Sequence, residues 1–166
     1  MYRTITIAAA CALVAGCNAS KQSAQAEEVP SALQSGEYEL AWTDLKTSSS
    51  DKKLADANVA ALMPARACVA AGGRIESAAF AEKGDDCRTM NSYVRNGIVN
   101  VQLLCSREGK GSVSQVVSGS FRADSFKADV QTTTSFAGGA NFTRTGKIAA
   151  RRVGDCPAKD KEATES

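Results

Sequence analysis

Apolar and polar residues alternate along much of the chain, and this alternation predicts half-buried strands. In residues 36–45, Tyr38, Leu40 and Trp42 fall on one face, while most of the intervening positions are polar. A period of two places successive side chains on opposite faces of a sheet. The segment is therefore predicted to be a strand with one face against a core.

From residue 87 onward the same alternation predicts an antiparallel meander. Turns are predicted at residues 95–97, 108–110, 124–125 and 137–139, with a last strand over residues 141–153. The three-residue loop at 95–97 pairs Val94 with Ile98. One face of these strands is apolar and carries Tyr93, Val99, Val101, Leu103, Val113, Val117, Phe121, Phe126, Ala128 and Val130. The other face is mostly polar, so the sheet is expected to have one core face and one solvated face.

Two short helices are predicted before the meander. The first covers residues 51–63, with Ser50 as its cap and Pro64 as its stop. The second covers residues 74–83 and ends at Gly84. A sheet with one apolar face must be closed or covered. The predicted fold is therefore mainly β: a curved antiparallel meander, either a half-barrel or a small barrel, plugged by at least one short helix.

Residues 1–16 have the composition of a secretion signal. Arg3 supplies a positive charge near the start, and residues 5–15 are almost wholly apolar. This order is typical of signal peptides. The apolar run is too short for a transmembrane helix, which takes about 20 apolar residues.

Residues 14–17, Val-Ala-Gly-Cys, resemble the lipobox of bacterial lipoproteins. The resemblance implies that Cys17 carries a lipid on its thiol and becomes the first residue of the mature chain. The alternative is an ordinary signal peptide that is cut nearby. Asn18, at a place where Asp retains lipoproteins in the inner membrane, favours the outer membrane. The expected location is the cell envelope, lipid-anchored and facing the periplasm.

The rest of the chain divides into three parts. Residues 17–35 are polar and are predicted to be a lipidated tether, residues 36–156 a single β-rich domain, and residues 157–166 a charged, flexible tail. Removal of residues 1–16 leaves 150 residues with a net formal charge near +1. That balance argues against a nucleic-acid partner, because phosphate binding needs a surplus of clustered Lys and Arg. The expected partner is the membrane, through the lipid on Cys17.

The cysteine count predicts two disulfides. The chain has six cysteines, and four remain once Cys11 leaves with the signal and Cys17 takes the lipid. An even number in an oxidising compartment is typical of a disulfide framework. These four are Cys68, Cys87, Cys105 and Cys156.

The strand register selects the pairing. When the register of the hairpin at residues 95–97 is continued outward, Cys87 falls opposite Cys105. Side chains approach closely at a non-hydrogen-bonded position of this kind, so a cross-strand disulfide is feasible there. Cys68 and Cys156 then pair by elimination.

The sequence gives little support for catalysis, and no catalytic, cofactor or metal site is predicted. It contains no histidine, no Cys-x-x-Cys and no glycine-rich phosphate loop. Two acidic pairs, Glu37 with Glu39 and Asp85 with Asp86, could serve a two-carboxylate hydrolase if they faced a cleft. The favoured interpretation puts the first pair on the solvent face and the second in a loop.

A basic cluster lies along the predicted last strand. It consists of Arg144, Lys147, Arg151 and Arg152. These side chains could contact anionic lipid or glycan, but the favoured interpretation is that they protect an exposed sheet edge.

Several short motifs resemble those of DUF3617, a family of small exported proteobacterial proteins that are often lipoproteins. They are Gly36-Glu37-Tyr38-Glu39, Ala67-Cys68-Val69, Asp86-Cys87, Cys105-Ser106, Val117-Ser118-Gly119-Ser120-Phe121 and Arg151-Arg152-Val153-Gly154-Asp155-Cys156. Their order covers nearly all of residues 36–156. The resemblance implies a four-cysteine envelope domain, and it brings no activity or catalytic residue with it.

Three functions remain open at this point. The first is a non-enzymatic envelope lipoprotein that binds a small apolar ligand on the curved sheet or supports envelope structure. The second is a protein-binding module, such as an inhibitor of cell-wall hydrolases, with Ser118-Gly119-Ser120 as a loop candidate. The third, a hydrolase, has the least support, and the chain is expected not to be an enzyme.

Overall fold

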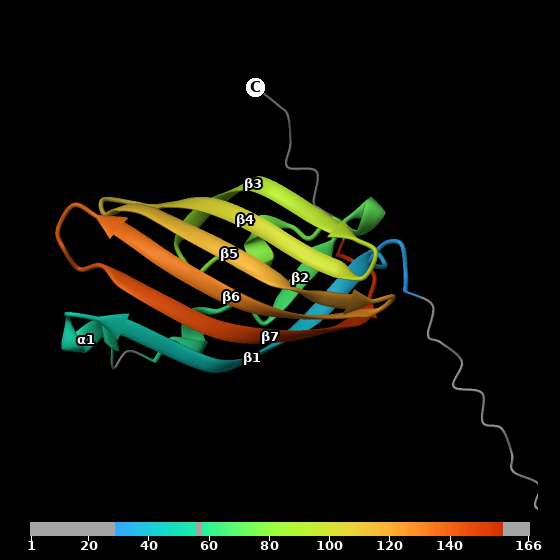
Figure 1. The fold of residues 1–166 in the computed structure, drawn as a ribbon, viewed down its shortest axis with the longest axis horizontal. Coiled ribbons are helices and arrows are strands. Elements are labelled where there is room, and N and C mark those ends of the chain that lie inside the picture. Colours follow the sequence, from blue (N-terminus) through green and yellow to red (C-terminus); the bar gives the residue numbers. More distant parts are fainter. Residues whose placement is uncertain (1–28, 56–57, 158–166) are drawn as a thin grey trace, which may run out of the picture.

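Seven antiparallel strands form a single curled sheet in the computed structural model, which describes residues 29–55 and 58–157. The strands are β1 (Gly36–Ser49), β2 (Arg66–Val69), β3 (Asp85–Arg95), β4 (Ile98–Arg107), β5 (Gly111–Arg122), β6 (Ser125–Phe136) and β7 (Phe142–Gly154). Their order across the sheet is β2-β1-β7-β6-β5-β4-β3 (Figure 1). Strands β3 to β7 are the predicted meander. Its last strand, β7, lies beside β1, the first strand of the chain. The prediction of a curved, mainly β half-barrel is confirmed.

The core lies on the inner face of the curl, between the sheet and the segment that joins β2 to β3 (Figure 1). Phe80 comes from that segment and is fully buried, and its ring meets Phe126 of β6 edge-on, with 6.5 Å between the centroids. Tyr38 of β1 packs on the same Phe126 ring at 6.0 Å. The strand residues that share this core are Leu40, Val69, Val94, Val99, Val101, Leu103, Cys105, Val113, Val117, Phe121, Ala128, Val130, Ile148 and Ala150.

Both predicted helices are largely wrong. Where residues 51–63 were expected to be helical, there is one turn, α1 (Lys52–Ala55), and a separate 3-10 turn, η1 (Ala60–Leu62). The capping group is Asp51, whose Oδ1 accepts a hydrogen bond from the Lys53 amide at 2.9 Å, so Ser50 does not have the role predicted for it.

The second predicted helix, residues 74–83, contains only the 3-10 turn η3 (Ser77–Ala79). A further 3-10 turn, η2 (Ala71–Gly73), precedes it. Ile75 instead forms a β-bridge with Val69, which holds the start of the segment in an extended conformation. The predicted plug is therefore an irregular strap with Phe80 as its buried anchor.

The β3–β4 hairpin differs from the prediction at its turn and agrees with it at the cysteines. The loop has two residues, Asn96 and Gly97, with φ of 52° and 75°, as in the tight turns that match strand twist. Arg95 therefore pairs with Ile98, which corrects the predicted Val94–Ile98 pair. This shift places Val94 in the core and leaves Tyr93 exposed, contrary to the prediction.

A β-bulge restores the predicted register before the cysteines are reached. The register shifts by one residue between Thr89 and Asn91, which leaves Met90 as the extra residue of β3. Beyond the bulge, Cys87 lies opposite Cys105 as predicted. Two errors of one residue cancel, so the disulfide was predicted correctly from a turn of the wrong length.

The other turns agree more closely. Residues 108–110 form the predicted three-residue loop between Arg107 and Gly111. The next turn is centred on residues 123–124, one residue earlier than predicted, because Arg122 pairs with Ser125. Gly119, on the inner face of β5, has no room for a Cβ, which would overlap the carbonyl oxygen of Lys127. The missing side chain permits this close approach where the sheet curls.

The end of the predicted tether is packed against the domain. Leu33 is buried in the core, and the Gln34 amide donates to the carbonyl oxygen of Ala123 at 2.8 Å. The Tyr38 hydroxyl donates to the carbonyl oxygen of Gln34, also at 2.8 Å. Residues 29–35 thus pack at the end of the sheet that carries the β3–β4 and β5–β6 turns. Residues 17–28 lie outside the described residues.

Because Tyr38 is buried, we predict that the domain loses stability at alkaline pH. Burial raises the pKa of its hydroxyl from 10.0 to about 12, so the native state holds this proton more tightly than the unfolded chain does. The stability that depends on Tyr38 is therefore present below pH 10.0 and lost as the pH rises to about 12. In a Tyr93→Phe protein without residues 1–16, Tyr38 is the only tyrosine, so near-ultraviolet absorbance reports its ionisation.

Denaturant unfolding over the same pH range is expected to show the loss of stability. A Tyr38→Phe variant should lose this part of the pH dependence. Ionisation of Tyr38 near pH 10 in the folded protein would contradict the prediction.

Candidate functional site

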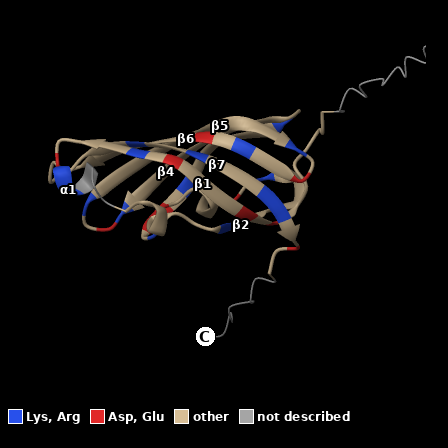
Figure 2. Ribbon diagram, turned by 90° about the horizontal axis from the view of Figure 1, so that it is seen from below, with Lys and Arg blue, Asp and Glu red and all other residues tan. Residues whose placement is uncertain are grey.

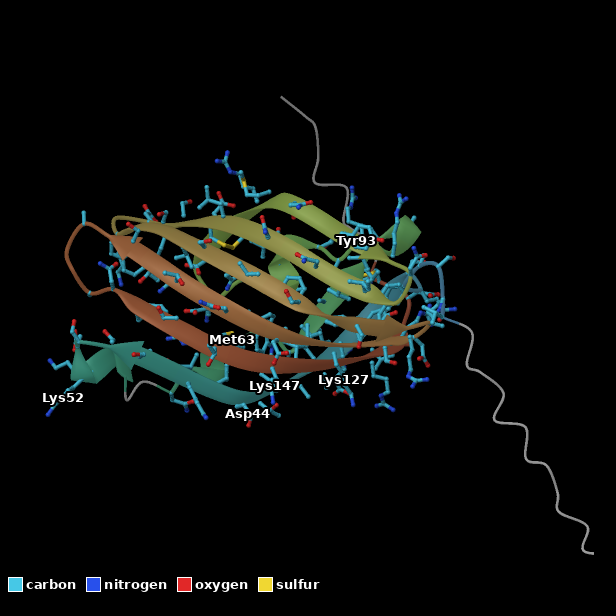
Figure 3. All side chains as sticks on the ribbon, in the orientation of Figure 1. Asp44, Lys52, Met63, Tyr93, Lys127 and Lys147 are labelled. Atoms are coloured by element: carbon cyan, nitrogen blue, oxygen red, sulfur yellow. A yellow bond between two sulfur atoms is a disulfide. The ribbon has the colours of Figure 1, made fainter. Side chains whose placement is uncertain are left out.

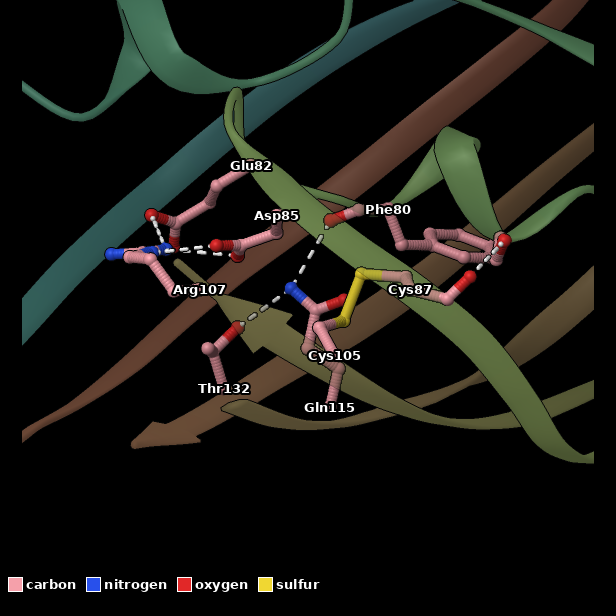
Figure 4. The surroundings of a disulfide bond; sticks show 9 residues. Phe80, Glu82, Asp85, Cys87, Cys105, Arg107, Gln115 and Thr132 are labelled. Atoms are coloured by element: carbon pink, nitrogen blue, oxygen red, sulfur yellow. Dashed lines mark hydrogen bonds and ion pairs between the residues drawn. A yellow bond between two sulfur atoms is a disulfide. The ribbon is translucent and has the colours of Figure 1, made fainter. Parts of the chain in front are cut away.

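Four charged side chains meet inside one end of the half-barrel. Figure 4 shows three of them, Glu82, Asp85 and Arg107. Glu82 lies just before β3, Asp85 begins β3, Arg107 ends β4 and Arg144 lies in β7. Arg107 donates Nε to Asp85 Oδ1 at 2.5 Å and Nη2 to Asp85 Oδ2 at 2.8 Å, which is a bidentate pair. The Asp85 hydrogen bonds are the largest cause of a raised Arg107 pKa.

Glu82 links the two arginines of this ionic cluster. Its Oε2 accepts from Arg107 Nη2 at 2.9 Å, and its Oε1 accepts from Arg144 Nη1. The Glu82 and Arg144 side chains are 1% and 4% exposed. Two carboxylates and two guanidinium groups balance one another in this site, as buried charges require.

Aromatic rings and a hydroxyl complete the environment of the arginines. The Arg144 guanidinium lies 4.4 Å from the centroid of the Phe142 ring, and its Nε donates to Thr47 Oγ1 at 2.9 Å. The Arg107 guanidinium lies 5.6 Å from the Phe136 ring centroid. Every charge of the ionic cluster is thus engaged, and the arrangement ties β1, β3, β4 and β7 together.

Buried Gln115 extends the polar interior toward the middle of the sheet (Figure 4). Its Nε2 donates to the Phe80 carbonyl at 3.1 Å and to Thr132 Oγ1 at 3.2 Å, while its Oε1 has no partner. The hollow that adjoins Gln115, Trp42 and Arg144 has no room even for a water molecule. In the described part of the chain, the inner face is therefore filled by side chains at this end.

Three of the four predicted acidic side chains lie beside an arginine. Asp85 is bound to Arg107 with its side chain fully buried, while Asp86 is exposed, and both belong to β3, which corrects their predicted place in a loop. Glu37 pairs with Arg66 at 2.8 Å, and Glu39 lies 3.6 Å from Arg151 on the outer face.

The predicted role of the basic cluster is wrong. Its strand, β7, pairs with β1 on one side and β6 on the other, so it is not a sheet edge. Arg144 points inward, Lys147 lies 3.3 Å from Asp44, and Arg152 lies 2.5 Å from Asp155. Figure 2 shows both signs of charge interspersed along β1, β6 and β7. The edges of the sheet are β2 and β3.

Both predicted disulfides are present. Cys87 and Cys105 are joined within the β3–β4 hairpin, with Cα atoms 3.9 Å apart. Cys68 of β2 is joined to Cys156, which follows β7, with Cα atoms 5.7 Å apart. The long bridge therefore fastens the end of the domain to its shortest strand. Cys17, the predicted lipidation site, lies outside the described residues.

The surface of the domain has shallow hollows. A hollow of ≈ 690 Å³ lies over the outer face of β6 and β7, beside Lys127, Ala149 and Arg151. Among the described residues, no group of three or more Cys, Asp and Glu side chains could hold a metal ion. No helix in that part of the chain is long and apolar enough to span a bilayer.

Comparison with known proteins gives a family and no activity. Searches of curated proteins and of solved structures found no match. The family model described as "Protein of unknown function (DUF3617)" matches residues 15–156, a span that includes the four disulfide cysteines and the whole sheet. The chain belongs to the DUF3617 family.

Proposed function

We propose that this protein is a lipid-anchored, non-enzymatic component of the cell envelope that acts through the outer surface of a rigid domain. The observation that carries the proposal is the filled interior. Glu82, Asp85, Arg107 and Arg144 are committed to one another, and the hollow beside Gln115 admits no water. A reactive site needs a group that substrate can reach, whereas the side chains of Glu82, Asp85 and Arg144 are at most 4% exposed.

The same packing favours surface recognition over an enclosed apolar ligand. Phe80 and Phe126 occupy the inner face, where such a ligand would have to lie. Ser118, Gly119 and Ser120 are ladder positions within β5, paired with both β4 and β6, so they form no projecting inhibitory loop. Support of the envelope, or binding of an envelope partner on the outer surface, is therefore favoured over hydrolase inhibition through that segment.

The anchor is supported by the residues that precede the domain. Small residues and Cys17 follow directly after an apolar run of signal-peptide length. One acyl chain gives only reversible membrane binding, whereas two or three chains on a single cysteine hold a protein stably. Two disulfides in a domain of this size also fit an oxidising compartment.

Intact mass spectrometry of the protein purified from bacterial membranes tests the proposal. The expected mass is that of residues 17–166 with a diacylglyceryl group and an added acyl chain, and the protein should stay with the membranes after a high-salt wash. A Cys17→Ala variant should lose both properties. A mature chain that starts elsewhere, or that has no acyl mass, would refute the anchor.

A further inference from the structure

Exposed apolar side chains gather at the β3–β4 hairpin. Val29, Tyr93 and Ile98 are 63%, 45% and 50% exposed. Val29 lies against the turn, because a Cβ added to Gly97 would be 2.8 Å from Val29 Cγ1. Ile98 follows Gly97 directly, and Figure 3 shows Tyr93 near the same end of β3.

Tyr93 and Ile98 share the outer face of the hairpin. Arg95 pairs with Ile98 and Tyr93 with Asn100, so Tyr93 and Ile98 are diagonal neighbours on adjacent strands. Diagonal neighbours of this kind lie within reach of an aromatic side chain. Arg95, also exposed, adds a positive charge at the same place. We call Val29, Tyr93, Arg95 and Ile98 the hairpin corner.

The hairpin corner is also where the described chain begins. Only eleven residues separate Val29 from Cys17. Because a chain spans at most about 3.3–3.6 Å per residue, the two positions can be no more than about 40 Å apart. If Cys17 is lipidated, as proposed above, the hairpin corner is held within about that distance of the lipid surface. The loops at the other end of the sheet lie about 40 Å farther along strands of 12 residues.

The chemistry of the hairpin corner fits a phospholipid surface. A tyrosine ring is apolar with a polar tip and is favoured at the level of lipid headgroups. Val29 and Ile98 can enter the boundary between headgroups and acyl chains, and the Arg95 guanidinium can donate to lipid phosphate. Because the lipid holds the domain nearby at a high effective concentration, even a weak contact is sufficient.

We propose that the hairpin corner docks on the phospholipid surface of the membrane that holds the Cys17 lipid, and so fixes the orientation of the domain. The inference rests on the lipid anchor. In the docked state, the β3–β4 hairpin faces the bilayer, and the ionic cluster and the loops at residues 108–110 and 137–139 point away from it.

Paramagnetic relaxation tests the orientation. The deuterated, nitrogen-15-labelled lipoprotein, checked by intact mass, is placed in nanodiscs of phosphatidylethanolamine and phosphatidylglycerol. A trace of lipid with a gadolinium chelate on its headgroup is then added. The amide signals of residues 93–98 should be attenuated at least about five-fold more than those of residues 108–110, because the two ends are about 40 Å apart.

Two variants make the test specific. Tyr93→Thr with Ile98→Thr keeps β-forming residues at both places, and it is expected to reduce the attenuation at residues 93–98 to that of the far end. Val116→Thr is the matched control, because Val116 is also exposed, at 41%, but lies in mid-strand on β5. The control should retain the wild-type pattern, and the amide spectrum itself reports whether each variant is folded.

The outcomes separate the two proposals. An intact mass without acyl chains refutes the anchor before any docking is measured. With the acyl mass present, uniform attenuation, or attenuation that the double substitution leaves unchanged, refutes docking by the hairpin corner. Concentration-dependent broadening of residues 93–98 without lipid would show that a second copy of the chain covers them, and would also refute it.

Discussion

Replacing Glu82 with alanine is expected to lower the free energy of unfolding by about 3–5 kcal/mol. Glu82 is the shared partner of Arg107 and Arg144, and its side chain is 1% exposed. Its loss leaves the buried Arg144 side chain with Thr47 Oγ1 as its one remaining hydrogen-bond acceptor in the described part of the chain. Desolvation of an uncompensated charge, rather than the loss of one attraction, makes the effect large. Urea unfolding of the oxidised domain measures it.

The matched control is Glu37→Ala. Glu37 also forms an ion pair, with Arg66 at 2.8 Å, but the Arg66 side chain is 60% exposed. An exposed pair of this kind contributes about 0.2–1 kcal/mol. If the two alanine variants lose similar stability, the ionic cluster does not behave as a buried charge network. The double variant Glu82→Leu with Arg144→Met should be more stable than Glu82→Leu alone. The second substitution removes the buried charge that Arg144 would otherwise leave unpaired.

Removing the Cys68–Cys156 bridge is the second large effect expected. The two cysteines are 88 residues apart, and the entropy of closing a loop of that size corresponds to about 4–5 kcal/mol. β2, which contains Cys68, has only four residues; in the described sheet it is an edge strand beside β1, and Val69 adds a single bridge to Ile75. Cys68→Ala with Cys156→Ala should therefore lower the global stability and free β2 from the sheet first, as amide hydrogen exchange of residues 66–69 would show.

The hairpin bridge provides the comparison. Cys87 and Cys105 are 18 residues apart, and their loop corresponds to about 3 kcal/mol. The flanking strands pair along the whole β3–β4 ladder, and we expect this pairing to persist when the bridge is removed. The double alanine variant at Cys87 and Cys105 should thus be less destabilised than the variant at Cys68 and Cys156. The reverse order would show that these disulfides do not stabilise the domain mainly by restricting the unfolded chain.

The alternation of side chains predicted the sheet well because it depends on one geometric fact, the period of two. Val99, Val101 and Leu103 share a face whatever the length of the turn, and the structure buries all three. Tyr93 was misplaced because its face depends on the turn length, which a single extra residue inverts. Asn-Gly at 96–97 is typical of a two-residue turn, so that error could have been avoided.

The helices could not be predicted from local pattern alone. Residues 74–83 have an acceptable helical composition, but the Val69–Ile75 bridge and the burial of Phe80 hold them in an irregular path. Tertiary contacts override helix propensity easily in segments this short.

The ionic cluster was missed because charged residues were assigned to the surface by type. The signal was present in the register. Arg107 follows Leu103 and Cys105 at even spacing, and Arg144 has the same spacing from Phe142 and Ile148. If the period of two is applied to charged residues as well, it places Arg107 and Arg144 on the inner face of the sheet. The structure confirms this placement. Glu82 lies in the irregular strap and gave no such signal.

The bulge at Met90 has a consequence for how relatives of this chain are to be aligned. The bulge adds one residue between Cys87 and the Asn96-Gly97 turn, and the cysteine pair and the turn both stay in place. A family member without the bulge would be one residue shorter there and would still form the same disulfide. We therefore expect the number of residues between this cysteine and the turn to differ by one among relatives. A one-residue gap at this place would then indicate a change in the geometry of the sheet edge within the same fold.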